Sequence, residues 1–301
     1  MSEQLFGGIE MGGTKVICAI GDSHGKITKR ISIPTKTPDN TMPDIIKYFI
    51  EVQKHHSLSA IGVACFGPID LNKNSKTYGF ITTTPKITWR NFNYVKAIQK
   101  PLGLPVGFDT DVNAAALAEK RWGAGNGLNS LLYLTVGTGI GGGVLCEGKL
   151  LHGLQHPEMG HIIIPRDSSD ISFKSACPYH ENCLEGLASG PSIKNRWHVN
   201  SALDLPPTHQ AWTLEANYLG TAIANYILTL IPERIILGGG VMKQKQLFPM
   251  IRDKVLTVLN GYISKDEIIK HIKQYIVPTG LGQNSGICGA IALAEAAYQA
   301  E

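Results

Sequence analysis

A strand, a glycine-rich turn and a second strand follow one another twice in this chain, and this repeat constrains its fold more than any other feature. The first copy starts near residue 5 and reads LFGGIE, MGGTK and VICAIGD. The second starts near residue 131 and reads LLYLTV, GTGIGGG and VLCEG. Successive backbone N–H groups in such turns form concavities that bind anions. The repeat therefore predicts a duplicated α/β domain with two phosphate-binding turns that face one cleft.

Neither turn fits the common nucleotide-binding motifs. The first has the order Gly12-Gly13-Thr14-Lys15, whereas a P-loop needs Gly-Lys-Ser/Thr and a following helix. The second contains Gly137-x-Gly139-x-x-Gly142, but the expected continuation from Val144 is a hairpin arm that turns at Glu147-Gly148, so we reject a dinucleotide-binding fold. An ordinary hairpin without a ligand remains the alternative at the first turn. Glu10 at the strand end is a candidate to hold Mg²⁺ through water.

Histidine and cysteine side chains cluster in the middle of the chain. His161 precedes a Cys-x2-His-x2-Cys segment formed by Cys177, His180 and Cys183. Four thiolate or imidazole ligands are typical of a structural Zn²⁺ site, which leaves no position open for water. Two alternatives stay open on spacing alone. The cysteines could be buried hydrophobic side chains without a metal, or His156 could replace His161 as a ligand.

Two carboxylates flank these candidate ligands. Glu158 lies three residues before His161, and Glu185 lies two residues after Cys183. A loop clamped by a metal fixes the direction of its side chains before a substrate arrives. We therefore expect the metal to shape one wall of a polyol pocket and to take no part in the chemistry.

Composition indicates a globular protein and excludes several partner classes. The 301 residues are 43% hydrophobic and 17% charged, and the net charge of +4 contains no long basic run. No nucleic-acid partner is expected from such a charge pattern. The start MSEQLFGG lacks the pattern of a secretory signal, and no apolar run approaches the ~20 residues of a membrane helix. Scattered cysteines fit a reducing cytoplasm.

The first half of the chain alternates predicted helices and strands. Strands are expected at AIGVAC and PVGF, whereas TYGFITTTPKITW is too irregular for a core element. Helices are expected at 39–56, with Ile45, Ile46, Phe49 and Ile50 on one face, at 94–102 and from Val112 to Gly123. The strand PVGF ends in Asp109-Thr110-Asp111. An aspartate there either caps the next helix or acts as an active-site carboxylate at the carboxyl end of a strand.

The second half is predicted to be mostly helical around two short strands. The expected elements are a long helix from Trp212 to Ile231, the strands RIIL and QYIV, a helix at 247–259 and a final helix from Ile287 to Ala300. Glycine loops follow the two strands, at Gly238-Gly239-Gly240 and at GLGQNSG. They are candidate walls for a nucleotide base, and each is also consistent with a plain loop.

Four motifs in this order resemble the ROK sugar kinases: IEMGGTK, TVGTGIGGG, PEMGH and the cysteine loop that ends in CLEG. FGPIDL and YGFITTTPKITW are similar to the bacterial fructokinase branch. The resemblance implies two ribonuclease-H-like domains of the actin/Hsp70/hexokinase type around a cleft. The implied domains are residues 1–113, with the C-terminal helix 287–301 packed back on them, and residues 114–286 with the zinc loop. It also implies ATP and a hexose as substrates, Mg²⁺ and Zn²⁺ as cofactors, and a homodimer.

The resemblance also implies site residues. Asp111 corresponds to the catalytic base, Thr110 stands where the family has Asn, and Glu10 stands where it has Asp. PEMGH carries the family's sugar motif, so that His161 would serve both zinc and sugar, and a histidine replaces one cysteine of the zinc loop. The implied sets are Gly12, Gly13, Thr14, Lys15, Gly137, Thr138 and Gly139 for the ATP phosphates; Gly238, Gly239 and Gly240 for the base; Thr110, Asp111, Glu158, His161 and Glu185 for the sugar; and His161, Cys177, His180 and Cys183 for the metal.

The expected function is that of an ATP-dependent sugar kinase that converts D-fructose to fructose 6-phosphate. Asp111 would accept the proton of a primary hydroxyl as that oxygen attacks the γ-phosphate. Kinases for glucose, mannose or N-acetylmannosamine are the near alternatives. A non-catalytic sugar sensor is disfavoured because Asp111 and the turn glycines are present. A DNA-binding repressor of the family would carry a helix-turn-helix, and only nine residues precede Glu10.

Overall fold

The computed structural model describes residues 4–300 and divides into two units. Of the described residues, unit 1 comprises 4–127, 149–157 and 283–300, and unit 2 comprises 128–148 and 158–282. The first three residues of the MSEQLFGG segment and the last residue of the helix expected at 287–301 lie outside the described residues. Within residues 4–300, no helix combines the length and the apolar character needed to cross a membrane.

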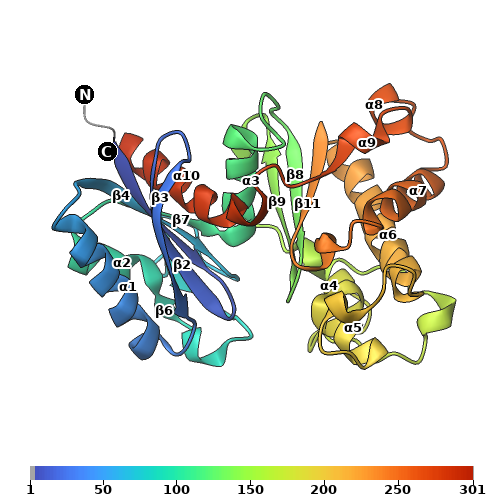
Figure 1. The fold of residues 1–301 in the computed structure, drawn as a ribbon, viewed down its shortest axis with the longest axis horizontal. Coiled ribbons are helices and arrows are strands. Elements are labelled where there is room, and N and C mark those ends of the chain that lie inside the picture. The colour runs from blue at the N-terminus through green and yellow to red at the C-terminus, as the bar shows by residue number, and fades with distance from the viewer. Residues whose placement is uncertain (1–3, 301) are drawn as a thin grey trace. The chain divides into compact units, whose positions relative to one another are not determined.

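Unit 1 is built on a five-stranded sheet in the order β3-β2-β1-β4-β7 (Figure 1). β1 pairs antiparallel with β2 and parallel with β4, and β4 pairs parallel with β7. The strands are β1 Leu5–Met11, β2 Lys15–Asp22, β3 Ile27–Pro34, β4 Leu58–Cys65 and β7 Val106–Thr110, with a small ribbon of β5 Phe80–Ile81 and β6 Phe92–Asn93. The helices of this unit are α1 Pro38–Gln53, α2 Tyr94–Leu102, α3 Asp111–Trp122 and α10 Ser285–Gln299.

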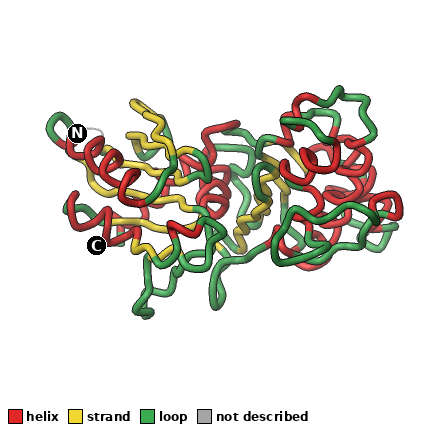
Figure 2. Tube along the Cα trace, turned by 90° about the horizontal axis from the view of Figure 1, so that it is seen from below, coloured by secondary structure: helices red, strands yellow, loops and turns green. Residues whose placement is uncertain are grey.

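The second five-stranded sheet has the order β10-β9-β8-β11-β12. Its strands are β8 Leu131–Val136, β9 Ile140–Cys146, β10 Lys149–Leu150, β11 Arg234–Gly238 and β12 Ile276–Pro278. The helices of unit 2 are α4 Leu184–Ala188, α5 Gly190–Trp197, α6 Ala211–Leu230, α7 Leu247–Leu259, α8 Asp266–Ile269 and α9 Ile272–Tyr275. Between residues 151 and 183, the chain is mostly loop, with short 3-10 turns and an isolated bridge between Ile163 and Cys183 (loops are green in Figure 2).

The two sheets repeat one topology, as the duplicated strand–turn–strand pattern predicts. In each, the first strand pairs antiparallel with the second across a tight turn, and parallel with the strand that follows a long connection. The turns join Met11 to Lys15 and Val136 to Ile140. Both glycine turns therefore occupy equivalent places in their sheets, after the first strand of each repeat.

Helix α10 packs closely on the sheet of unit 1. A Cβ atom at Gly62 of β4 would lie 1.8 Å from the carbonyl oxygen of Ala290, and one at Gly107 of β7 would lie 2.1 Å from that of Leu293. These approaches require glycine on the strands and small residues on the helix. They bring the C-terminal segment into unit 1, although α10 begins more than 160 residues after the end of α3.

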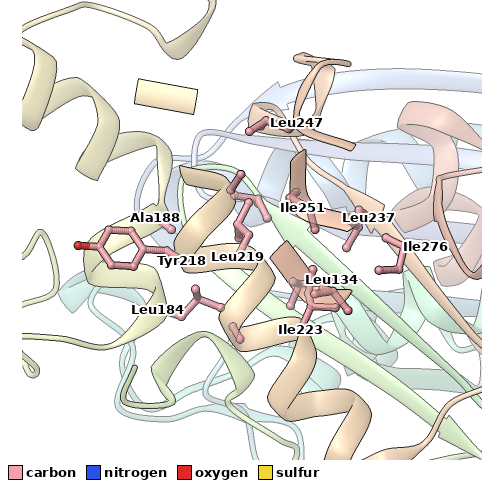
Figure 3. Packing of buried hydrophobic residues seen from close by; sticks show 14 of the residues in the cluster. Leu134, Leu184, Ala188, Tyr218, Leu219, Ile223, Leu237, Leu247, Ile251 and Ile276 are labelled. Carbon is pink, nitrogen blue, oxygen red and sulfur yellow. The ribbon is translucent and has the colours of Figure 1, made fainter. Parts of the chain in front are cut away.

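The core of unit 2 lies between its sheet and helices α6 and α7. Figure 3 shows Leu219 and Ile223 of α6 beside Leu134 of β8, with Ile251 of α7 in the same cluster. All four side chains are buried almost completely. The apolar side chains that recur along α6 and α7 thus pack into the core of unit 2, as the sequence pattern predicts.

Several sequence expectations are wrong in detail. Gly141, Gly142 and Gly143 belong to strand β9 and not to a loop. Glycine is needed at position 142 because a Cβ there would lie 2.6 Å from the sulfur of Met159. Residues 274–275 are helical, so the short strand begins at Ile276. Ile50 is 44% exposed and lies off the apolar face of α1.

The segment TYGFITTTPKITW is a further correction, because it contributes to the core of unit 1. Ile81 and Trp89 are buried in the main hydrophobic cluster of this unit. The indole N–H of Trp89 donates to the carbonyl of Lys36 at 2.7 Å. Buried side chains on irregular backbone have no periodicity, so their burial is not visible in the sequence pattern.

Candidate functional site

The first glycine turn is a tight connection that Thr35, the residue after β3, contacts from outside. The N–H of Gly12 donates to the carbonyl of Lys15 at 3.0 Å, and the hydroxyl of Thr35 donates to the carbonyl of Gly12 at 2.8 Å. A Cβ at Gly12 would lie 2.8 Å from the Lys15 oxygen, so this position requires glycine. The predicted residues Gly12, Gly13, Thr14 and Lys15 are therefore together in one rigid turn.

Lys86 lies at the same turn and was not predicted. A Cβ placed on Gly13 would be 3.8 Å from the Lys86 ammonium nitrogen. This lysine comes from the irregular segment before Trp89 and brings a positive charge to a turn whose N–H groups suit an anion. The sequence shows only a lysine among threonines, and this pattern does not predict where the lysine side chain lies.

Glu10 and Asp111 are two acidic side chains in unit 1 whose environments disfavour ionisation. Burial raises the pKa of Asp111 to about 6, against the opposing hydrogen bond from the N–H of Val112 at 2.9 Å. Burial, followed by the negative charge of Asp111, raises the pKa of Glu10 to about 7. A carboxyl with a pKa near 6 is suited to accept a proton at neutral pH. A buried carboxyl whose pKa is raised by a second acidic group, as that of Glu10 is by Asp111, also suits a divalent cation.

The junction of β7 and α3 is ordered by hydrogen bonds around Asp111. The hydroxyl of Thr110 accepts from the N–H of Asn113 at 3.1 Å and so caps α3. Asp109 is 4% exposed, and its Oδ1 accepts from the N–H of Thr110 at 2.7 Å and from the amide of Asn113 at 2.8 Å. The cap of α3 is therefore Thr110 and neither aspartate; Asp109 orders the junction, and Asp111 is the first residue of the helix.

His152 completes this junction and was not predicted. Its Nε2 lies 2.9 Å from Oδ2 of Asp109, and this hydrogen bond raises the pKa of His152. The pair lines a hollow of about 530 Å³ in unit 1, together with Tyr78 and Phe108. No local sequence signal connects two residues that are 43 positions apart.

The second glycine turn is held by the start of α5 and by Glu185. The N–H of Gly190 donates to the carbonyl of Gly137 at 2.7 Å, and the N–H of Gly137 donates to that of Gly139 at 2.9 Å. Oε2 of Glu185 accepts from the N–H of Ile140 at 2.9 Å. All of these contacts lie within unit 2.

The four predicted metal ligands converge in unit 2. One ligand atom from each of His161, Cys177, His180 and Cys183 lies within 4.8 Å of the others. The sulfur of Cys177 is 3.6 Å from Nδ1 of His180 and 3.8 Å from Nδ1 of His161, and the sulfur of Cys183 is 3.7 Å from Nδ1 of His161. Tetrahedral Zn²⁺ would place sulfur and nitrogen ligands about 3.6 Å apart. The donor set and its spacing therefore fit a structural zinc site.

His156 is not part of this cluster. Its Nε2 accepts a hydrogen bond from the N–H of Ile69 at 3.1 Å within unit 1, and burial lowers its pKa. The alternative ligand set with His156 in place of His161 is therefore wrong. The other ring nitrogen of His161, Nε2, lies 3.8 Å from Oε1 of Glu185.

The remaining glycine loops differ from one another. Gly239 has a φ of +92°, and a Cβ there would lie 2.3 Å from the carbonyl of Val136, whereas Gly240 has open space around it. The segment GLGQNSG forms a 3-10 turn, Gly282–Asn284, and then the first turn of α10. The first loop thus keeps an open backbone surface, and the second is largely helical.

Comparison with solved structures defines the class of fold. A ROK family glucokinase from Streptomyces griseus, solved with glucose and AMPPNP, matches with a TM-score of 0.77 at 25% identity, covering 97% of this chain and 99% of that one. This match and the repeated sheets confirm the predicted actin/hexokinase type of fold.

Comparison with sequences defines the family. The ROK family model matches residues 6–297, and the chain belongs to the ROK family. The chain is 51% identical to a putative fructokinase of Bacillus subtilis strain 168, over 99% of this chain and 97% of that protein. It is 43% identical to a fructokinase of Pediococcus pentosaceus, over 98% of this chain and 99% of that protein.

Proposed function

We propose that the protein is an ATP-dependent fructokinase that converts D-fructose to fructose 6-phosphate. The observation that carries this proposal is the 43% identity to a fructokinase over 98% of this chain and 99% of that protein. At this identity and coverage, both glycine turns, the Asp111 junction and the Cys/His cluster fall within the matched region. We also place the enzyme in the cytoplasm, where ATP is available.

Asp111 acts as the general base in this proposal. Its carboxylate accepts the proton of the primary hydroxyl while the oxygen attacks the γ-phosphorus, and the bond from that phosphorus to the bridging oxygen of ADP breaks. The protein positions the reactants and neutralises charge, and forms no covalent intermediate. A pKa of about 6 keeps most of Asp111 ionised at pH 7 and still basic enough to take the proton.

The two glycine turns bind the phosphates of ATP, and the N–H groups of Gly12 and Gly137, which close the turns themselves, are not among the donors. Gly12, Gly13, Thr14 and Lys15 contribute from one turn, and Gly137, Thr138 and Gly139 from the other. Lys86 adds a positive charge at the first turn. Glu10 holds Mg²⁺ through water, and ionisation of this carboxyl becomes favourable when the cation is present. Gly238, Gly239 and Gly240 lie against the base.

Thr110, Glu158, His161 and Glu185 bind sugar hydroxyls together with Asp111. The metal held by His161, Cys177, His180 and Cys183 is Zn²⁺, which supplies structural order to the 158–185 segment and no step of the reaction. Binding of a metal through Nδ1 of His161 leaves its Nε2–H as a donor. A hydroxyl oxygen is a suitable acceptor for that proton.

A coupled assay of ADP release over a panel of hexoses tests the proposal. We expect kcat/KM for fructose to exceed the values for glucose, mannose and N-acetylmannosamine by at least about tenfold, because a site built to pair with each hydroxyl discriminates against a misplaced one. A higher value for one of the other three sugars would assign the enzyme to that hexose. Absence of ADP release with every sugar, despite nucleotide binding, would identify a sensor.

A further inference from the structure

Glu185 lies between the metal ligands and the second glycine turn and contacts both. Its Oε2 accepts from the N–H of Ile140 at 2.9 Å, and its Oε1 is 3.8 Å from Nε2 of His161. A Cβ on Gly139 would lie 2.7 Å from the same Oε2, so the carboxylate fills the space directly behind the turn. A hydrogen bond to an ionised acceptor is stronger than one between neutral groups.

The metal ligand Cys183 sets the position of Glu185. Cys183 is the N-cap residue of α4, and its sulfur accepts from the N–H of Gly186 at 3.3 Å. The backbone beside it is fixed by the hydrogen bond from the N–H of Leu184 to the carbonyl of Ile162 at 3.0 Å. The sulfur that faces His161 therefore also defines the first turn of the helix that carries Glu185.

The turn has a second support that does not involve Glu185. The N–H of Gly190 holds the carbonyl of Gly137, and a Cβ on Gly160 would lie 1.8 Å from the carbonyl of Ile140. Loss of the carboxylate would thus loosen one side of the turn and leave its packing in place. This makes the effect of Glu185 measurable in a folded protein.

We propose that Glu185 is a positioning residue through which the metal site orders the phosphate-binding turn Gly137–Ile140. The inference rests on the proposed function for the identity of the turn's ligand, and on the geometry of unit 2 for the coupling. The account extends the sugar-binding role proposed for Glu185, because each carboxylate oxygen has two lone pairs and can also accept from a hydroxyl. It predicts that nucleotide binding depends on Glu185 even when no sugar is present.

Amide hydrogen exchange tests the coupling without any substrate. In the zinc-loaded protein, Glu185→Ala should speed exchange of the Ile140 amide by about tenfold, because this N–H loses its charged acceptor. Glu185→Gln keeps one carbonyl oxygen for the same N–H and should stay within about threefold of the wild type. Glu181→Ala, an exposed carboxylate of the same loop, is the matched control and should change nothing. Removal of the metal with a chelator should act in the same direction as Glu185→Ala.

Binding of Mg²⁺–AMPPNP without sugar is the second measurement. We expect the Kd to rise about tenfold in Glu185→Ala and to be largely restored in Glu185→Gln, by the same argument. The inference would be overturned if, in Glu185→Ala, the exchange rate of the Ile140 amide and the nucleotide Kd both stay within twofold of the wild type. Glu185 would then contact the sugar only. If the wild type binds no nucleotide, the proposed function fails, and the exchange measurement still decides the coupling.

Discussion

At the scale of single residues, the proposed chemistry depends on the junction of β7 and α3. Asp111 is mostly surrounded by protein atoms, and its carboxylate accepts a hydrogen bond from the N–H of Val112, whereas Asp109 and Thr110 satisfy the neighbouring backbone. Its raised pKa follows from this burial. A carboxyl group in such an environment is primed to take up a proton rather than to stabilise the fold.

Asp111→Asn should lower kcat at least about a hundredfold, because removal of a general base typically costs 10²–10⁴-fold. The amide keeps the shape of the side chain, so the nucleotide Kd should remain within about threefold of the wild type. Steady-state kinetics measure kcat, and titration with AMPPNP measures the nucleotide Kd. Asp44→Asn, an exposed carboxylate on α1, serves as the control. Turnover near the wild-type value in Asp111→Asn would show that another group takes the proton.

The acid limb of the pH profile should reflect the raised pKa of Asp111. The base is active only when ionised, and its pKa is about 6, so kcat/KM should fall as the pH drops below this value. Protonation of Glu10, whose pKa is about 7, would weaken Mg²⁺ binding in the same direction, so saturating Mg²⁺ is needed. We expect an apparent pKa between 6 and 7 in profiles from pH 4 to 8. A limb centred near 4 would contradict the assigned base environment.

At the scale of elements, the sequence predicts those parts that carry a local pattern. Helices α2 and α7 lie where the sequence pattern predicts them, and the Cys/His loop converges because three ligands come from one short segment. Strand β3 gave little signal because most of its residues are exposed. The glycines of β9 resemble a loop, although their function is to admit Met159. The Asp109–His152 pair depends on chain topology and could not be found locally.

The packing of α10 on β4 provides a test at this scale. Gly62→Ala should lower the free energy of unfolding by about 3 kcal/mol, because the new methyl would overlap the backbone of α10 and overpacking costs ~1–3 kcal/mol or more. Gly153→Ala is the control in the same unit, since its Cβ would meet nothing closer than 4.0 Å. Chemical denaturation of both variants measures the difference. Equal stability would mean that α10 does not approach the sheet this closely.

At the scale of the whole molecule, two sheets of one topology each present a glycine turn at the same place, and unit 2 adds the Cys/His cluster. Burial raises the pKa of Cys183 to about 12, so without a cation this thiol stays protonated. A bound metal would favour the thiolate and cross-link four points of the 161–183 segment. Metal binding to the cluster would therefore add to the stability of unit 2.

Metal removal should lower the thermal stability of the protein. A ligand present at 1,000 times its Kd stabilises by about 4 kcal/mol, and each kcal/mol corresponds to roughly 2–4 °C for a chain of this size, so a decrease in Tm of roughly 10 °C is expected. Calorimetry before and after chelation measures it, with the metal content determined in parallel. Cys183→Ser should reproduce the loss, and Cys146→Ser, at an exposed cysteine outside the cluster, should not. An unchanged Tm after complete metal loss would contradict the structural role.

The most direct test of the central claim, that this protein transfers the γ-phosphate of ATP to the primary hydroxyl of fructose, is ³¹P NMR of the complete reaction. With Mg²⁺–ATP and fructose, the account predicts equal amounts of ADP and a phosphomonoester at carbon 6, with Asp111→Asn forming neither at a comparable rate. Formation of ADP with inorganic phosphate alone, or of a phosphate ester at another carbon, would contradict it.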